Sequence, residues 1–126
     1  MRKVSIAIGE FEIHAELRNT PTADEIFKHL PFSSSAQTWG DEIYFITPAK
    51  NIALEKDAKD VVELGELAFW VEGACIAIGF GPTPISKGDE IRLAAKTNIW
   101  AITSDDLTIL KSIQSGQSIV VTAIEN

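Results

Sequence analysis

Residues 38–48 read TWGDEIYFITP and combine a tryptophan, a glycine, two adjacent carboxylates and a Tyr-Phe pair. Successive side chains in a β-strand point to opposite faces, so Glu42 and Tyr44 would face one way and Ile43 and Phe45 the other. The apolar pair makes the better core, because an ionised carboxylate inside a barrel costs several kcal/mol without a partner. We therefore expect Ile43 and Phe45 in the interior and Glu42 and Tyr44 on the outer face.

Similar short apolar runs recur along the whole chain, separated by glycines, prolines and charges. Near the start, alternation before and after Gly9 predicts two strands over 4–8 and 11–17. Later strand-like runs are GDEIYFIT (40–47), ELAFWV (66–71), CIAIGF (75–80), DEIRLAA (89–95) and SIVVTAI (118–124). The composition of 51–65, NIALEKDAKDVVELG, would permit a helix, but we expect a loop that leads into a strand from Val61.

Two segments have helical signals. In TPTADEIFKHLP (20–31), Thr22 and Glu25 have capping-box spacing and Pro31 ends the helix. A second helix is predicted from Ser104, which would cap it, to about Ser115. Many short strands with two well-separated helices indicate a mainly β protein, a closed barrel with a helix over each open end.

Composition limits the class of protein. A chain of 126 residues is long enough for one domain, here 1–126, with one core. No apolar run reaches the roughly 20 residues of a membrane span, and we read no signal peptide in the first residues. With Cys75 as the only cysteine, no internal disulfide can form, so we expect a soluble, cytoplasmic protein. The net charge of −7 argues against a nucleic-acid partner, and we expect no membrane partner.

Four segments carry a family resemblance: LPFSSSAQTWGDEIYF (30–45), VVELGELAFWVEG (61–73), IAIGFGPTP (76–84) and KSIQSGQSIVV (111–121). With the order of strands and helices, they resemble the small cyclophilin-like proteins of bacteria and archaea over nearly the whole chain. The resemblance implies a closed eight-stranded barrel capped by two helices. It implies no known reaction, because the role of this group is not established.

The sequence departs from the pattern of proper cyclophilins, which are prolyl isomerases. Their groove carries an arginine on a barrel strand, and the segment here that should supply it is 39–47. No Arg or Lys lies between Lys28 and Lys50, and neither His14 nor His29 falls in the segment that would carry the groove histidine. We therefore do not expect prolyl isomerase activity, since the arginine polarises the prolyl amide.

Six residues are candidates for lining an external groove, as in the cyclophilin fold. Glu42 and Tyr44 share the outer face of their strand, with Trp39 at its edge. Trp70 alternates away from Leu67 and Phe69, so its ring would either lie in the groove or pack under a loop. The full candidate set is Trp39, Glu42, Tyr44, Trp70, Phe80 and Thr83.

Other motifs favour structural roles. GFGPTP (79–84) lacks the third glycine and the following helix of a phosphate cradle, so we expect a rigid turn in which Gly81 permits an unusual backbone. Thr83 would offer its hydroxyl at the groove rim. Cys75 lies in an apolar strand and is expected to be buried and unreactive. No ligand spacing indicates a metal, and we expect no cofactor.

Two classes of function remain open. The first is a non-catalytic binding module with a groove for a peptide-like or small organic ligand. The alternative is an enzyme, either a divergent prolyl isomerase or a small-amide hydrolase, for which Glu42 is the one candidate base. The catalytic residues of such an enzyme, and the oligomeric state, do not follow from the sequence.

Overall fold

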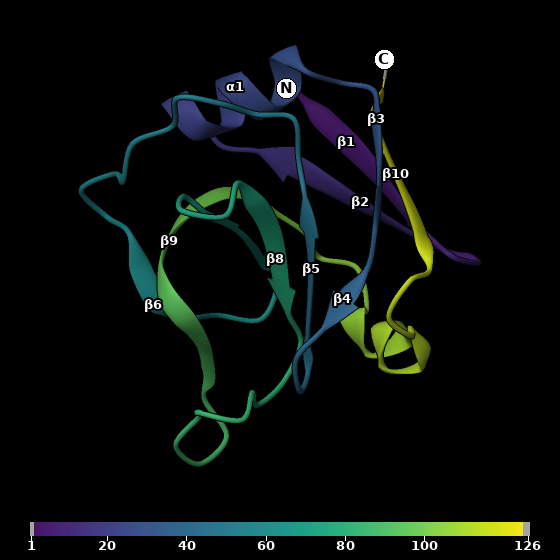
Figure 1. The fold of residues 1–126 in the computed structure, drawn as a ribbon, viewed down its shortest axis with the longest axis vertical. Helices are drawn as coiled ribbons and strands as arrows, with labels where there is room; N and C mark the ends of the chain where they lie inside the picture. Colours follow the sequence, from purple (N-terminus) through teal and green to yellow (C-terminus); the bar gives the residue numbers. More distant parts are fainter. Residues whose placement is uncertain (1, 125–126) are drawn as a thin grey trace.

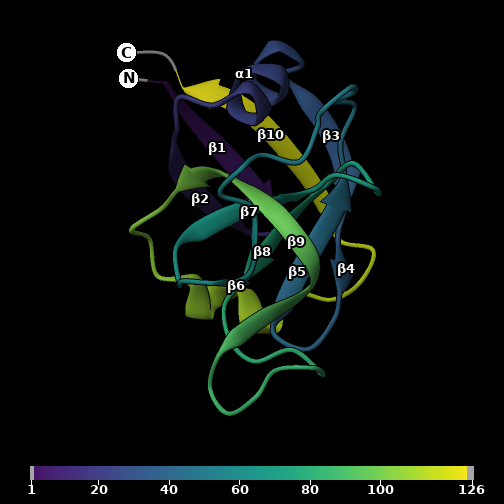
Figure 2. The ribbon, with the colours of Figure 1, turned by 90° about the vertical axis from the view of Figure 1, so that its left-hand side faces the viewer.

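The computed structural model describes residues 2–124, which form ten strands, one α-helix and one 3₁₀ helix (Figure 1). The strands are β1 (Lys3–Ile8), β2 (Phe11–Leu17), β3 (Phe32–Ser35), β4 (Gln37–Thr38), β5 (Glu42–Ile46), β6 (Lys59–Val62), β7 (Glu66–Trp70), β8 (Cys75–Gly79), β9 (Ile91–Ile102) and β10 (Ser118–Ile124). The helices are α1 (Pro21–Lys28) and η1 (Leu107–Ser112). In Figures 1 and 2, α1 lies at the top of the molecule and η1 (yellow-green) lies below its middle, while the loop between β8 and β9 extends furthest down.

The strands follow one another around a nearly closed barrel. Their order is β3-β10-β1-β2-β9-β7-β8-β5-β4, every pairing along it is antiparallel, and β6 pairs separately with β9. The first and last strands of this path, β3 and β4, are separated only by the buried Ala36. They act as two halves of one bent strand, which pairs with β10 through its first half and with β5 through its second. With β3 and β4 counted as one strand, the barrel has the eight strands that the resemblance implies.

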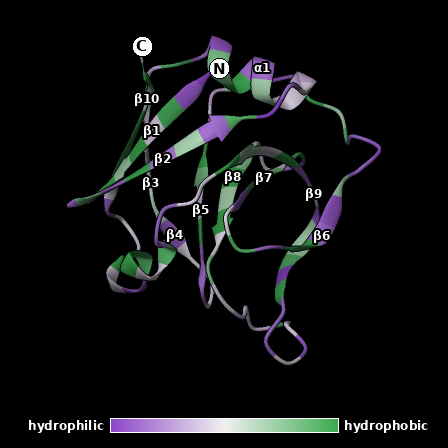
Figure 3. Cartoon of the chain, turned by 180° about the vertical axis from the view of Figure 1, so that it is seen from behind, coloured by the Kyte–Doolittle hydropathy of each residue, from purple (hydrophilic) through white to green (hydrophobic). Residues whose placement is uncertain are grey.

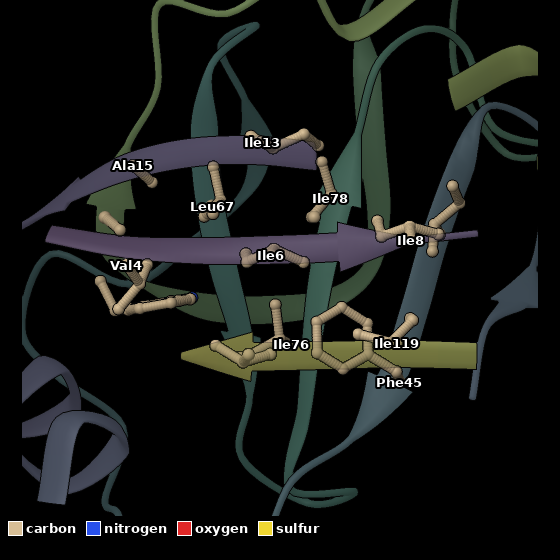
Figure 4. Packing of buried hydrophobic residues seen from close by; sticks show 14 of the residues in the cluster. Val4, Ile6, Ile8, Ile13, Ala15, Phe45, Leu67, Ile76, Ile78 and Ile119 are labelled. Atoms are coloured by element: carbon tan, nitrogen blue, oxygen red, sulfur yellow. The ribbon is translucent and has the colours of Figure 1, made fainter. Parts of the chain in front are cut away.

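The interior of the barrel is filled by the residues that alternation assigns to it. Val4, Ile6 and Ile8 of β1 are fully buried, and so are Ile43 and Phe45 of β5. Figure 4 shows side chains of β1, β2 and β10 meeting those of β5, β7 and β8. Hydropathy also alternates along β1 and β2 in Figure 3, as expected for strands with one exposed face. The predicted phase of the opening stretch is confirmed.

A second, smaller apolar layer lies outside the barrel. The long strand β9 pairs with β7 and β2 through its second half, whereas its first half pairs with β6. This first half and β6 form an arm that packs on the outer face of the sheet. The apolar residues buried between arm and sheet are Val62, Ala68, Ala77, Ile91, Leu93 and Ile99. Gly79 allows the close approach, since a Cβ there would lie 2.4 Å from Cγ2 of Ile91.

Both helices differ in detail from the prediction. Helix α1 starts earlier than a capping box at Thr22 would allow. Pro21 is its first residue, a position for which the fixed φ of proline is suited. Thr20 caps the helix, because its side chain accepts a hydrogen bond from the Ala23 N–H at 3.1 Å. Thr22 is buried and its hydroxyl donates to Glu55 at 2.6 Å. Helix α1 ends at Lys28, before Pro31.

The second helix is shorter than predicted and of the 3₁₀ type. Its cap is Asp106, whose side chain accepts from the Thr108 N–H at 3.0 Å, rather than Ser104. The preceding residues are held against β2: the Asp105 carboxylate accepts from the His14 N–H at 2.8 Å, and the Thr103 hydroxyl donates to the His14 carbonyl at 2.7 Å. These bonds delay the start of the helix.

The segment before β6 is a loop, as predicted. Asn98 of β9 holds it, because its side-chain Nδ2 donates to the Ala53 carbonyl at 2.9 Å and its Oδ1 accepts from the Glu55 N–H at 2.8 Å. Strand β6 begins at Lys59, two residues before the predicted Val61. None of the helices among residues 2–124 has the length and apolar character needed to cross a bilayer.

Candidate functional site

The outer face of β5, β8 and β7 carries a row of side chains that the strand register brings together. Tyr44 pairs with Ala77, which in turn pairs with Ala68, and Cys75 pairs with Trp70. Directly opposed residues of neighbouring strands point to the same side of a sheet. These side chains therefore lie opposite to the interior face that Ile43 and Phe45 occupy.

A pocket of about 200 Å³ opens on this face, beneath the arm. This volume is several times the ~30 Å³ share of one water molecule in the liquid. It therefore admits a small organic molecule or a single bulky side chain. Its lining residues are Trp39, Glu42, Tyr44, Trp70, Cys75, Ala77, Leu93, Ala94, Ala95 and Thr97. We call it the aromatic pocket.

An irregularity in β9 supplies the wall opposite the sheet. Lys59 of β6 pairs with Thr97, and Val61 pairs with Arg92, so two steps along β6 oppose five steps along β9. The additional residues bulge away from the ladder. Leu93, Ala94 and Ala95 lie within this bulge and line the pocket.

Glu42 is the one acidic residue among the described residues that line the pocket. Glu42 is only 6% exposed, and its Oε1 atom has no hydrogen-bond partner among residues 2–124. Burial raises the pKa of the Glu42 carboxyl to about 7, because the ionised form loses hydration there. The carboxyl is thus balanced between its neutral and charged forms near neutral pH. A solvent-accessible groove was predicted around it, but the arm of β6 and β9 covers this part of the sheet.

The turn before β5 positions Trp39 at the pocket. The Trp39 N–H donates to the Glu42 carbonyl at 3.0 Å, and Gly40 between them has a φ of +59°, which glycine adopts without strain. The turn is joined to the GFGPTP segment by two backbone bonds, from Asp41 N–H to the Pro82 carbonyl and from Phe80 N–H to the Asp41 carbonyl. The region is a turn, as expected.

The prediction that Gly81 permits an unusual backbone is wrong. Gly40, not Gly81, has the positive φ in this region. Gly81 instead lies close to the Asp41 side chain, because a Cβ there would lie 2.4 Å from its Oδ2 atom and the side chain would have to move.

Cys75 lies at the far side of the pocket from the turn. It is 4% exposed, which confirms that it is buried, and its thiol donates to the Gly73 carbonyl at 3.4 Å. Burial, followed by the nearby charge of Glu42, raises the pKa of the Cys75 thiol. The thiol is therefore held in its protonated, weakly nucleophilic form.

The structure brings together four of the six candidate residues: Trp39, Glu42, Tyr44 and Trp70 all line the aromatic pocket. Phe80 and Thr83 do not. Phe80 follows the end of β8, packs partly against the main core and borders a separate hollow with Val61 and Ile91. Thr83 is buried in the turn, where its hydroxyl donates to the Arg92 carbonyl and its N–H donates to Ser86 Oγ at 2.9 Å.

Several lining residues were absent from the candidate set. Cys75 and Ala77 follow from the register of β8 against β5 and β7, which the sequence does not reveal. The bulge in β9 has a weak signal, since the adjacent Ala94 and Ala95 interrupt its alternation. Among residues 2–124, no three His, Cys, Asp or Glu side chains are grouped so as to hold a metal ion.

None of the residues within 2–124 that line the aromatic pocket is basic. Arg92, which precedes the bulge, is engaged elsewhere: its Nε atom lies 2.6 Å from a Glu90 carboxylate oxygen and its NH1 atom 3.3 Å from Asp60. Lys96, which lies between the lining residues Ala95 and Thr97, is exposed and is not among them.

Comparisons with known proteins agree with this architecture. The sequence profile of the family described as cyclophilin-like matches residues 2–122. The solution structure of a hypothetical protein from Archaeoglobus fulgidus superposes with a TM-score of 0.80 at 36% sequence identity, over 96% of this chain and 93% of that one. None of the curated proteins compared with the chain matches it.

Proposed function

The chain belongs to the cyclophilin-like family, and from this premise we propose that it is a non-catalytic binding module that holds a small organic ligand, or one side chain of a peptide-like ligand, in the aromatic pocket. The observation that carries the proposal is the convergence of three aromatic rings and one buried carboxyl on a single cavity. Ligand sites are typically concave, mainly apolar and equipped with a few polar groups that orient the ligand. The aromatic pocket has this composition.

The polar groups of the pocket support binding rather than reaction. The Cys75 thiol has a raised pKa and so is a poor nucleophile. The lining residues that the structure describes include no basic side chain to stabilise a developing negative charge, which is usually the largest catalytic contribution. Glu42 alone is suited to act on a bound molecule.

A fragment screen tests the proposal. Small neutral, cationic and anionic compounds are added to the isotope-labelled protein, and the indole N–H signals of Trp39 and Trp70 are followed by NMR. We expect a subset of compounds to shift both signals and to saturate. Ala95→Leu, which adds volume at a half-exposed wall position, should reduce this binding, whereas Ala123→Leu, on an exposed site of β10, should not. Absence of any saturable shift would refute the proposal.

The alternative function is an enzyme, and one observation favours it. A general acid or base works best when its pKa lies near the working pH. Burial gives Glu42 a pKa of about 7. In this case the protein would be a divergent prolyl isomerase or a small-amide hydrolase with Glu42 as the base, and turnover of a bound amide that is lost in Glu42→Gln would favour it.

We also propose a cytoplasmic location. Cys75 is the only cysteine and lies buried as a free thiol, so the fold depends on no disulfide. This is the usual condition of proteins in a reducing compartment.

A further inference from the structure

The lining of the aromatic pocket is chemically one-sided. Three of its residues, Trp39, Tyr44 and Trp70, present aromatic rings, and Glu42 adds an acidic group. The remaining lining residues are alanines, a leucine, a threonine and a cysteine. An aromatic ring has a negative face and an ionised Glu42 is negative, so these four residues favour positive charge in the cavity.

We propose that the ligand of the aromatic pocket is a small methylated ammonium cation, held by the rings of Trp39, Tyr44 and Trp70 and by the carboxylate of Glu42. The inference rests on the proposed binding function and specifies its ligand class. A cation over the face of Trp or Tyr is attracted by the ring quadrupole, and recognition of methylated ammonium groups by aromatic cages uses this attraction.

The unpartnered oxygen of Glu42 supports a cationic ligand. A buried carboxylate without a partner is unfavourable, and a bound cation supplies the missing charge. An anion would be repelled by Glu42, and a neutral apolar molecule would leave its oxygen unpaired. Because burial raises the pKa of Glu42 to about 7, a bound cation would also draw the carboxyl toward its ionised form near neutral pH.

The shortage of hydrogen-bond acceptors favours a methylated ammonium over a primary amine. A primary ammonium has three N–H donors that need acceptors when they are buried. Apart from Glu42, the side-chain acceptors among the described lining residues are the hydroxyls of Tyr44 and Thr97, and most other lining side chains are apolar. Indole N–H groups are donors only. A methylated ammonium presents few or no such donors and buries methyl groups against the rings.

The net charge of the whole protein also favours a cationic ligand. The net charge of −7 raises the local concentration of cations around the molecule. The volume of about 200 Å³ leaves room for a trimethylammonium group and a short attached chain.

The test compares charge at constant shape. Choline and its neutral carbon analogue 3,3-dimethylbutan-1-ol are titrated into the protein at pH 8 and fixed low salt, with calorimetry and the Trp39 and Trp70 indole signals as readouts. We expect choline to bind at least about tenfold more tightly than the neutral analogue, and butylamine to bind more weakly than choline. Equal or tighter binding of the neutral analogue would overturn the inference.

Variants separate the contributions of carboxylate and rings. Glu42→Gln should weaken choline about tenfold without weakening the neutral analogue, and Trp70→Leu should weaken choline with Glu42 intact. Glu10→Gln removes one charge from an exposed turn away from the pocket and should change neither affinity.

Choline binding that is unaffected by Glu42→Gln and Trp70→Leu contradicts the inference. Binding of neutral fragments alone overturns it but leaves the proposed function standing, whereas a pocket that takes no compound removes both.

Discussion

The indole ring of Trp70 lies directly against the backbone of Gly73. A Cβ atom at Gly73 would be 2.3 Å from Cζ3 of Trp70 and 2.4 Å from its Cε3 atom, far inside van der Waals contact. The φ of Gly73 is not in the left-handed region, so glycine is needed here for space. The turn between β7 and β8 thus positions Trp70, which forms one wall of the aromatic pocket.

We expect Gly73→Ala to displace the Trp70 ring, with a loss of roughly 1–3 kcal/mol in the free energy of unfolding, as for other overpacked sites. Tryptophan fluorescence and chemical denaturation measure the two effects. Gly116→Ala is the control for the fluorescence change alone, because its Cβ would meet no atom within 4 Å, whereas its φ of +94° makes it lose stability through backbone strain. An unchanged Trp70 indole signal in Gly73→Ala would contradict the packing described.

Glu42→Gln should change how stability depends on pH. Because burial raises the pKa of Glu42 from 4.5 to about 7, the folded state keeps a proton that the unfolded chain loses between these values. The free energy of unfolding of the unmodified protein should therefore fall as the pH rises through this window, by up to about 3 kcal/mol from this group. The Cys75 thiol, whose pKa is raised above 9.0, does not contribute in this window.

The variant lacks this titration. Denaturation midpoints of the two proteins, measured from pH 4 to pH 8, should diverge in favour of Glu42→Gln as the pH rises. Parallel curves would show that the carboxyl is hydrated in the folded state.

Phe45→Ala should cost roughly 3–5 kcal/mol, because the fully buried ring fills the barrel interior. Ile46→Ala, in the next position of β5, is the matched control and should cost less than about 1 kcal/mol, since Ile46 is 67% exposed. Chemical denaturation measures both. A greater cost for Ile46→Ala would place β5 in the opposite phase.

Cys75 should react with a thiol reagent at pH 8 at least about tenfold more slowly in the native protein than in denaturant, because its thiol is buried and its pKa is raised. Glu42→Gln should speed native labelling while leaving it slower than in denaturant, since burial is the larger cause and the Glu42 charge the smaller. Labelling as fast before denaturation as after it would be inconsistent with this position.

No acceleration of prolyl isomerisation is expected. The described residues that line the aromatic pocket include no arginine, and Arg92 is paired with Glu90 and Asp60. A coupled assay on a proline peptide, with a proper cyclophilin as the positive control, measures this. A rate near that of the control, abolished by Glu42→Gln, would establish the enzymatic alternative instead.

The alternation of side chains along a strand was sufficient to predict which residues of β5 and β7 face the interior and which lie on the outer face. It assigned Ile43 and Phe45 to the core and placed Glu42, Tyr44 and Trp70 on the opposite face, because strand geometry leaves each side chain only two directions. The same rule does not say what covers an outer face. The arm that buries Glu42 depends on pairings between β6 and β9 that are distant in sequence.

Phe80 and Thr83 show a second limit of the sequence. Beyond Gly79 the strand ends, and period-two spacing no longer applies. The direction of Thr83 is determined by hydrogen bonds to Ser86 and Arg92, which form only in the folded turn. The bulge of β9 likewise depends on its register with β6, which the strand propensities of the residues do not predict.

The two walls of the aromatic pocket belong to parts of the fold with different connections. Strand β8 lies between β5 and β7, whereas the first half of β9 pairs with β6. Amide protons of β8 should therefore exchange with solvent through global unfolding, and those of the arm through local opening. A ligand bridging the walls would slow hydrogen exchange in β6 as well, although no β6 residue lines the pocket. The amides of β6 thus report occupancy of a cavity that they do not touch.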